Sequence, residues 1–298
     1  MLINSFLDHL RYERNYSERT ITSYRIDLLQ FEEFLKGEDE NNEFTTVDAD
    51  LIRGWVVSLM DEKCKPASVN RKLSSLRSFY HFLIRDGKMT VNPMSKVVGP
   101  KKTKPLPVFL REDEMSRLLD EIPFEESFEG FRDRLILEMF YSTGIRLSEL
   151  INIKISDIEK KNRIIKIIGK GNKERYVFFS NECVNYLNAY LEDSRPYLNR
   201  KNSEYLFLNN TGDKLTAAGI QYIVKKILDS SGLSVKLTPH VLRHTFATHM
   251  LNEGANLMTV KELLGHSNIS TTGIYTHVSN EQLRKTYLSS HPRARKDD

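Results

Sequence analysis

The sequence is poor in the features that mark secreted, metal-binding and membrane proteins. Its two cysteines, Cys64 and Cys183, lie far apart and in different expected domains, so they offer neither a disulfide framework nor zinc-ligand spacing. No apolar run approaches the roughly 20 residues that a membrane span requires. The first residues lack the basic flank and the long apolar stretch of a signal peptide. These absences favour a soluble, cytoplasmic protein with reduced thiols.

The sequence also has little excess charge, because its net charge is only +4 over 298 residues. That length is too great for one typical core and fits two domains. The charge is unevenly distributed: Lys63–Lys104 holds eleven basic residues and a single acid, Asp86, although residues 1–100 as a whole are balanced. Such segregation favours a face that binds a polyanion. A solvated helix face is the alternative interpretation.

Residues 1–90 are expected to form an N-terminal helical bundle, because apolar residues recur at helical spacing in four segments. The fourth segment, Ser68–Arg85, should direct Arg71, Lys72 and Arg77 outward, among small polar residues. Side chains of this kind suit the phosphates and the grooves of DNA. The three basic residues are therefore predicted DNA contacts, without any indication of the target sequence.

Residues 91–109 are expected to be a linker. The segment contains four prolines and no convincing helical period, and proline removes backbone donors and favours extended chain. The segment should therefore connect two domains and pack inside neither. Lys101 and Lys102 could follow a DNA backbone while the two domains close on a duplex as a clamp. A simple soluble hinge fits the composition equally well.

Residues 110–298 are expected to combine helices with a small antiparallel sheet. Helical patterns cover residues 111–119 and 131–142, and the chain becomes helical again after Cys183. Three strand-like runs lie between them, at residues 151–158, 163–168 and 175–179. The last two flank a glycine-rich turn, which predicts a β-hairpin with Lys170 at its tip. The predicted fold is thus mainly α with a small antiparallel β-sheet, and its rear domain is α+β.

Five residues of the rear domain suit chemistry on a phosphodiester. They are Arg146, His240, Arg243, His266 and Tyr275. Arginine stays charged at every working pH and its planar fork donates two parallel hydrogen bonds, so two arginines can neutralise the charge that develops on the phosphate oxygens. A tyrosine can attack the phosphorus and store the broken bond as a phosphotyrosine, which permits resealing without ATP.

The leaving sugar oxygen needs a proton, and a lysine such as Lys170 can supply it. A metal site is the competing interpretation, because His240, His244 and His249 approach helical ligand spacing. The zinc-protease pattern would require a glutamate directly after the first histidine, and that position is Val241. We therefore expect no metal, and the phosphotyrosine chemistry requires no cofactor.

Several stretches carry a resemblance to a known family. They are Ser142–Leu150, Thr238–His249 and Leu263–Val278, together with the lysine hairpin Gly169–Arg175 and the tail His291–Ala294. On these motifs the chain resembles the tyrosine recombinases of the phage integrase family, and specifically the Xer branch with its XerC and XerD types. The likeness extends to the front domain. It implies an N-terminal SAM-like core-DNA-binding domain and a tyrosine recombinase catalytic domain.

The resemblance implies a role for each candidate residue. The residues implied to hold and polarise the scissile phosphate are Arg146, His240, Arg243 and His266. Tyr275 would attack the phosphate to give a 3′-phosphotyrosyl intermediate and a free 5′-hydroxyl, with Lys170 as the general acid. Glu149 would orient Arg146 or a neighbouring histidine. His244 would support packing.

The resemblance also implies an assembly. Four protomers would hold two double-stranded DNA sites, together with a homologous XerD-like partner recombinase, and exchange strands through a Holliday junction. The amphipathic segment 280–288 would dock on a neighbouring subunit. The implied task is the resolution of chromosome dimers at segregation, with a DNA translocase of the division septum as a further candidate partner. Two alternatives stay open: an integrase of a mobile element, and an architectural DNA-binding protein without catalysis.

Overall fold

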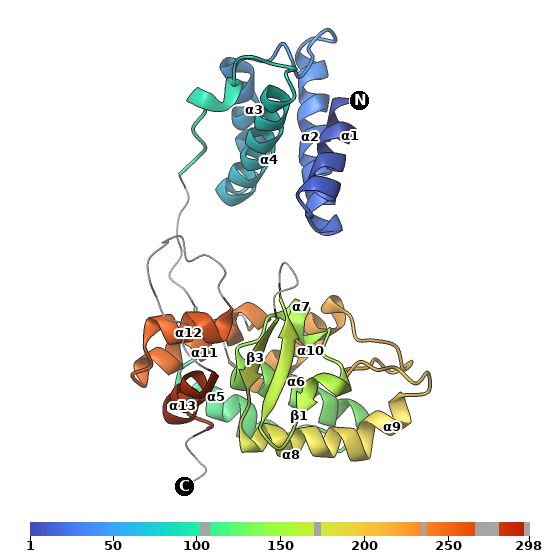
Figure 1. The fold of residues 1–298 in the computed structure, drawn as a ribbon, viewed down its shortest axis with the longest axis vertical. Coiled ribbons are helices and arrows are strands. Elements are labelled where there is room, and N and C mark those ends of the chain that lie inside the picture. The colour runs from blue at the N-terminus through green and yellow to red at the C-terminus, as the bar shows by residue number, and fades with distance from the viewer. Residues whose placement is uncertain (102–107, 170–173, 234–236, 266–279, 295–298) are drawn as a thin grey trace. The chain divides into compact units, whose positions relative to one another are not determined.

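The computed structural model describes residues 1–101, 108–169, 174–233, 237–265 and 280–294. The chain forms two compact units, Met1–Pro105 and Leu106–Asp298, which we call the front and rear domains. Helices dominate both, and a small sheet lies in the rear domain (Figure 1). None of the described helices combines the length and the apolarity needed to cross a membrane.

The front domain is a bundle of helices. Its elements are α1 (Leu2–Asp8), the π-helix η1 (His9–Glu13), α2 (Glu18–Glu38), α3 (Ala49–Asp61), α4 (Pro66–Arg85) and the 3₁₀-helix η2 (Pro93–Lys96). Local signals start the two longest helices. The hydroxyl of Ser17 accepts a hydrogen bond from the backbone of Thr20 at 3.3 Å, and Pro66 occupies the first turn of α4, where no N–H is needed. The apolar faces meet in an aromatic core in which the rings of Phe31 and Trp55 lie 4.8 Å apart.

The first half of the expected linker packs into the front domain. Met94 and Val97 are buried in its core, and η2 contacts α3 and α4. The side-chain amide of Asn70 also donates a hydrogen bond to the carbonyl of Pro100 at 2.8 Å. The prediction that residues 91–109 pack inside neither domain is wrong for this half. Burial of two apolar side chains outweighs the preference of a proline-rich run for exposed, extended chain.

The rear domain combines helices with a three-stranded antiparallel sheet in the order β1–β2–β3. Its strands are β1 (Ile158–Glu159), β2 (Ile164–Ile168) and β3 (Glu174–Phe178). Its helices are α5 (Glu112–Ser116), η3 (Arg117–Glu121), α6 (Phe128–Thr143), α7 (Leu147–Leu150), η4 (Ile155–Asp157), α8 (Asn181–Ala189), η5 (Tyr190–Ser194), α9 (Arg195–Leu198), α10 (Ala217–Ser231), α11 (Pro239–Asn252), α12 (Leu257–Leu264) and α13 (Asn280–Ser290). The largely buried α6 contacts α8, α10, α11 and β3 (Figure 1). The expected fold class, mainly α with a small antiparallel sheet, is confirmed.

Both strands of the hairpin expected around the glycine-rich turn are present. β2 and β3 pair antiparallel, with Ile165 opposite Val177 and Ile168 opposite Glu174. The turn itself, which contains Lys170, lies outside the described residues. The two strands therefore fix where the turn begins and where it ends.

The strand predicted at residues 151–158 is wrong for most of its length. A turn and η4 occupy this segment, and Ile158 alone joins β1. The backbone N–H of Ile155 donates to the carbonyl of Glu204 at 3.0 Å. A distant loop thus satisfies the backbone that a strand partner would otherwise have paired.

The last described helix, α13, packs on its own chain against α11, α12 and β3 (Figure 1). Tyr287 is buried, and its hydroxyl lies 3.0 Å from the hydroxyl of Ser142. His291 follows in the same core, with its Nε2 3.1 Å from the carbonyl oxygen of Tyr141. Tyr287 therefore belongs to the core of this domain. Docking of α13 on a neighbouring subunit stays a prediction.

Candidate active site

The first arginine of the site follows a helix end that requires glycine. α6 ends at Gly144, whose φ of +59° lies in the left-handed region. A Cβ at this position would lie 2.6 Å from Cδ1 of Phe246 and 2.8 Å from Cδ2 of Leu264. Because glycine has no Cβ, the turn packs closely on α11 and α12. The next turn of chain brings Arg146 to the N-terminus of α7.

The guanidinium of Arg146 is bound by protein acceptors and is also partly exposed to solvent. Its Nη1 donates to Oε1 of Glu149 at 2.9 Å, and its Nη2 donates to the carbonyl of Gly265 at 2.9 Å. The side chain is still 34% exposed. A guanidinium carries five N–H donors, so donors remain for an anion from solvent. This geometry is compatible with the phosphate contact predicted for Arg146.

Arg243, on α11, is the buried arginine of the pair. Its Nη1 donates to the carbonyl of Gly144 and its Nη2 to the carbonyl of Leu264, both at 2.6 Å. Burial, and then the positive charge of Arg146, lowers the pKa of Arg243 to about 10. The guanidinium therefore keeps its proton at neutral pH. Because these two partners are neutral carbonyls, its charge stays available to a nearby anion.

Glu149 is the buried carboxylate of the site, and its side chain is 4% exposed. Its Oε2 accepts the backbone N–H of Arg146 at 2.9 Å, and its Oε1 accepts Nη1 of the same residue. Burial opposes ionisation, but the hydrogen bonds and charge of Arg175, followed by the hydrogen bonds from Arg146, outweigh burial and lower the pKa of Glu149. The predicted contact with Arg146 is present, and its contribution to chemistry stays a prediction.

Arg175 is a residue of the site that the sequence motifs did not predict. From β3 it donates through Nη1 and Nη2 to the two oxygens of Glu149, at 2.7 and 2.9 Å, and its side chain is 15% exposed. Its Nε points to the carbonyl of Leu263 at 3.4 Å. The available signal was strand alternation, because Arg175 lies on the same face of β3 as the buried Val177. An arginine at an inward strand position requires an acidic partner.

All three arginines converge on the last turn of α12. Arg175, Arg243 and Arg146 donate to three consecutive carbonyls, those of Leu263, Leu264 and Gly265 respectively. The last carbonyls of a helix have no partner within the helix, and they form the negative end of its dipole. The end of α12 therefore binds and aligns the three cations.

His240 is exposed in the first turn of α11, one turn before the buried Arg243. Thr238 caps this helix by accepting the backbone N–H of Val241 at 3.2 Å, and Pro239 occupies its first position. The local sequence thus fixes where α11 begins. His240 and Arg243, at a spacing of three residues, share a side of the helix.

The other two histidines of α11 have structural partners. His249 is buried between the hydroxyl of Tyr141, 2.9 Å from its Nδ1, and the carbonyl oxygen of Leu110, 2.8 Å from its Nε2. The ring of His244 contacts that of Phe109 edge-on at 6.2 Å. In the part of the chain that the structure describes, no group of three or more His, Cys, Asp or Glu could hold a metal ion.

Three predicted catalytic residues, Lys170, His266 and Tyr275, lie outside the described residues. The elements beside them are described: β2 and β3 flank the turn of Lys170, and α12 ends at Leu264, two residues before His266. Of the predicted set, the structure therefore brings together Arg146, Arg243 and Glu149, and it adds Arg175.

The predicted DNA-contact residues of the front domain divide into two groups. Arg71, Arg77 and Lys101 are exposed, as expected, and Lys102 lies outside the described residues. Lys72 does not face outward. Its side chain is only 8% exposed and donates to Gln30 and, at 3.5 Å, to Asp27. The outward direction predicted for Lys72 is wrong because a buried carboxylate on α2 draws its ammonium inward.

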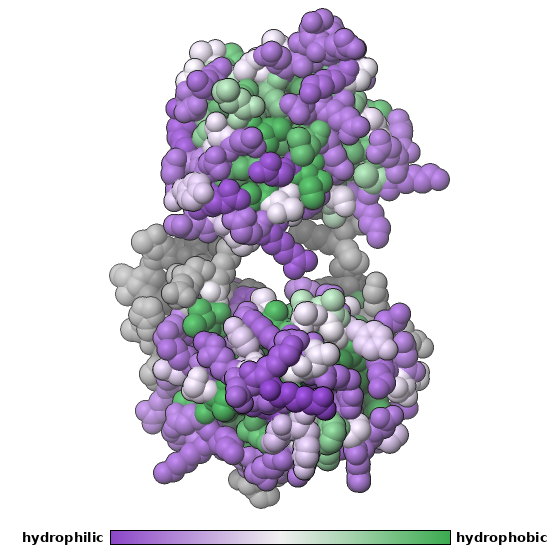
Figure 2. All heavy atoms as spheres, turned by 90° about the vertical axis from the view of Figure 1, so that its right-hand side faces the viewer, coloured by the Kyte–Doolittle hydropathy of each residue, from purple (hydrophilic) through white to green (hydrophobic). Residues whose placement is uncertain are grey.

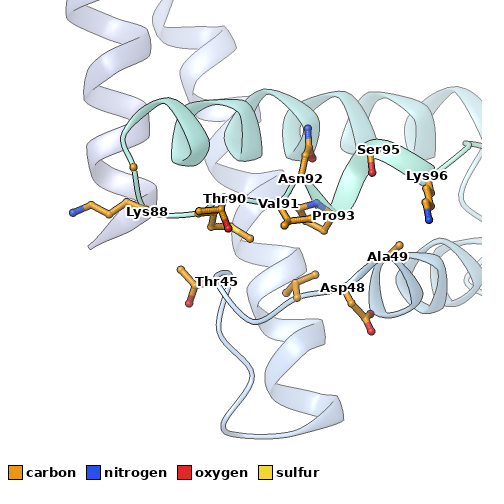
Figure 3. Close-up of a pocket in the computed structure, with 13 residues that line it drawn as sticks. Thr45, Asp48, Ala49, Lys88, Thr90, Val91, Asn92, Pro93, Ser95 and Lys96 are labelled. Atoms are coloured by element: carbon orange, nitrogen blue, oxygen red, sulfur yellow. The ribbon is translucent and has the colours of Figure 1, made fainter.

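The front domain also contains a cavity of about 540 Å³ between the loop before α3 and the segment after α4. Figure 3 shows Lys88 and Lys96 at its edge, with Asp48 on the opposite side. No candidate catalytic or DNA-contact residue lines this cavity. On the face of the molecule that Figure 2 shows, hydrophilic residues cover most of each domain.

Comparisons with known proteins agree with this architecture. Residues 108–282 match the phage integrase family, and residues 3–87 match the phage integrase N-terminal SAM-like domain. Tyrosine recombinase XerC of Staphylococcus carnosus is 46% identical over 293 residues, which cover 98% of both chains. Tyrosine recombinase XerC of Staphylococcus epidermidis is 45% identical over 294 residues, which cover 99% of this chain and 98% of the relative.

Two solved structures share the fold. The XerH site-specific recombinase bound to its difH substrate, in a pre-cleavage complex, is 25% identical, with a TM-score of 0.70 and coverage of 95% of this chain and 83% of that chain. The Tn1549 transposon integrase in complex with circular intermediate DNA is 21% identical, with a TM-score of 0.71 and coverage of 95% and 98%. At that identity the second comparison concerns the fold alone.

A helical front domain, an α+β rear domain and an arginine pair beside a buried carboxylate define the class, and the chain belongs to the phage integrase family of tyrosine recombinases. It is a site-specific DNA recombinase of the Xer type, similar over its full length to XerC proteins, and DNA is its partner. The family resemblance drawn from the sequence motifs is confirmed.

Proposed function

We propose that this recombinase cuts and rejoins DNA through a covalent phosphotyrosyl intermediate. The hydroxyl of Tyr275 gives up its proton to a base as its oxygen attacks the scissile phosphorus. The bond to the 5′-oxygen breaks, and Lys170 gives that oxygen its proton. The products are a 3′-phosphotyrosyl bond and a free 5′-hydroxyl, and rejoining reverses these steps. His240 and His266 add hydrogen bonds to the phosphate. No metal or other cofactor takes part.

The observation that carries this proposal is the aligned arginine pair. Arg146 and Arg243 donate to adjacent carbonyls at the end of α12, so both cationic groups are fixed before a substrate arrives. Three guanidiniums interact with one carboxylate, so the site has two positive charges in excess. A preorganised cationic site of this kind stabilises the charge that develops on a phosphate during transfer.

We further propose that the chain resolves chromosome dimers at segregation, in the cytoplasm. The names of its full-length relatives, XerC in two Staphylococcus species, support this assignment. The proposed assembly is a tetrameric synapse with a homologous XerD-like recombinase, in which strands exchange through a Holliday junction. A DNA translocase of the division septum is a proposed regulator. In this assembly α13 docks on a neighbouring subunit.

The decisive experiment uses a nicked suicide substrate built on a candidate dimer-resolution site, with and without a second Xer recombinase. The wild-type protein should form a protein–DNA adduct that survives denaturation. Tyr275→Phe should bind the site with normal affinity and form no adduct. Tyr222→Phe is the matched control, because Tyr222 is an exposed tyrosine on α10, and it should behave as the wild type.

Each outcome separates the competing functions. An adduct in Tyr275→Phe would show that another residue is the nucleophile. Binding without any adduct in the wild type, on every substrate and with the partner present, would favour the architectural DNA-binding protein. Adduct formation on the ends of a mobile element, but not on the chromosomal site, would favour an integrase.

A further inference from the structure

We propose that Arg175 is a positioning residue of the recombination reaction. It fixes Arg146 through the shared carboxylate of Glu149, and it joins the strand that carries the lysine hairpin to the end of α12. This inference rests on the proposed function, because it assumes that Arg146 contacts the scissile phosphate. Arg175 itself is not expected to touch DNA.

The first support is the way in which Glu149 is shared. Each carboxylate oxygen accepts one hydrogen bond from Arg175 and one from Arg146: Oε1 binds Nη1 of both residues, while Oε2 binds Nη2 of Arg175 and the backbone N–H of Arg146. A two-point fork fixes the plane of a carboxylate. With Arg175 in place, Glu149 can direct Nη1 of Arg146 in only one orientation.

The second support is the place of Arg175 in the fold. It is the second residue of β3, opposite Ile167 of β2, so it lies just beyond the turn that contains Lys170. Its Nε also reaches the carbonyl of Leu263, near the residue that precedes His266. One side chain thus contacts Glu149, which binds Arg146, and lies at the ends of β3 and α12 that border the segments containing Lys170 and His266.

The third support is the close approach of α12 to Arg175. A Cβ at Gly265 would lie 2.9 Å from Cδ and 2.9 Å from Nε of Arg175. The glycine has a φ of +65° and ends α12. Glycine at this position therefore serves two purposes, since it permits the left-handed turn and leaves room for the arginine.

Charge makes this arrangement sensitive to acid. The charged groups that face Glu149 are Arg146 at the start of α7, Arg175 on β3 and, at longer range, Arg243 on α11. Arg175 is the largest of the groups that lower the pKa of Glu149. If Arg175 is removed, burial opposes ionisation with less compensation, so Glu149 takes up a proton at higher pH and releases Arg146.

The test is a double-mutant cycle of Arg175→Ala and Glu149→Gln, with Arg175→Lys as a variant that keeps the charge but not the fork. Lys166→Ala is the matched control. It removes the exposed Lys166–Glu174 ion pair from the same hairpin. The measurements are site affinity by gel shift, the single-turnover rate of adduct formation on the suicide substrate from pH 5.5 to 8.5, and the thermal melting curve.

Arg175→Ala should bind the site within about threefold of wild type but form the adduct about 100-fold more slowly, as expected when a reacting group is displaced by about 1 Å. Arg175→Lys should recover only part of this loss, because an ammonium cannot donate two parallel hydrogen bonds. The double variant should be no slower than the slower single variant, since both act through one contact. The acid limb of the rate profile should move to higher pH in Arg175→Ala, and it should be absent in the double variant.

Several results would overturn the inference while leaving the proposed function intact. They are a wild-type rate in Arg175→Ala, additive losses in the double variant, full recovery in Arg175→Lys, and a pH profile that does not move. If Arg175→Ala fails to fold, additive losses in Arg175→Lys and Glu149→Gln would overturn it equally. Failure of the wild type to form any adduct is a different result, since it would remove the proposed function and this inference together.

Discussion

Within the described residues, each domain has a buried carboxylate that binds two cations, and the two sites differ in how freely those cations can move. In the front domain Asp27 accepts hydrogen bonds from Arg71, Lys72 and the hydroxyl of Ser75. Its arginine extends to the surface and is 51% exposed. In the rear domain Glu149 holds two arginines that both reach the end of α12.

The difference concerns rigidity. Arg71 has one anchor and an exposed stem, so it can adapt to the position of a backbone phosphate. Arg146 has Glu149 on one side and the Gly265 carbonyl on the other, so its position is set before DNA arrives. Adaptable contacts suit binding along a duplex. Fixed contacts suit a transition state, because they require no reorganisation during the reaction.

The largest expected effect is that of Glu149→Gln. The substitution keeps the shape but leaves two partly buried arginines, Arg146 and Arg175, facing a neutral amide. Adduct formation should therefore fall about 100-fold and the free energy of unfolding by about 4 kcal/mol. Suicide-substrate kinetics and urea denaturation measure the two effects. Glu204→Gln, which alters the exposed ion pair with Lys154, should change neither. Equal effects of the two variants would show that the burial of Glu149 does not increase its contribution to the rate or to stability.

The front-domain counterpart, Asp27→Asn, should have a smaller effect of a different kind. Arg71 would lose its anchor, so site affinity should fall about tenfold and the free energy of unfolding by about 3 kcal/mol. The rate of adduct formation at saturating protein should remain unchanged. Gel-shift titration and single-turnover kinetics separate affinity from rate. Asp50→Asn, at an exposed ion pair with Arg53, is the control. A lower rate at saturation would mean that the front domain also positions the catalytic groups.

The smallest effect is expected from acid, and it should begin in the rear domain. Burial lowers the pKa of His291 from 6.5 to about 3. The folded state therefore binds this proton less tightly than the unfolded state does, so stability is complete above pH 6.5 and is lost as the pH falls toward 3. Between pH 7.5 and pH 5.0 the expected loss is about 2 kcal/mol. The same fall in pH should lower the free energy of unfolding of His291→Gln by much less.

Urea denaturation checks this prediction domain by domain. The single tryptophan, Trp55, lies in the front domain, so its fluorescence reports that unit, whereas far-UV circular dichroism reports both. His81→Gln, at an exposed histidine on α4, is the control and should keep the wild-type pH dependence. An unchanged pH dependence in His291→Gln would assign the acid sensitivity to another group.

Much of the fold was predictable because its signals are local. Ser17 caps α2 as its position suggests, and Gly144 ends α6 where the pattern breaks. The wrong predictions concern groups whose partners lie far away in the sequence. Ile151, Ile153 and Ile155 alternate as in a strand. A carbonyl about fifty residues away nevertheless satisfies the backbone N–H of Ile155.

The residues of the candidate site were likewise predicted only in part. Motif order identified Arg146, Arg243 and Glu149, which the structure brings together. It did not identify Arg175, because the strand alternation that places Arg175 on the face of Val177 does not show which acidic residue of another element binds it. Lys72 failed for the equivalent reason, since the carboxylate that binds it lies 45 residues earlier in the chain.

The end of α12 limits how this sequence can vary in length. One residue inserted into this eight-residue helix would turn its last carbonyls by about 100° and advance them by about 1.5 Å. Three arginines from three different elements would lose their acceptors in a single step. Point substitutions on the outer face of α12 should be tolerated, whereas insertions and deletions should be confined to loops elsewhere. The length and register of α12 therefore fix the positions of all three arginines at once.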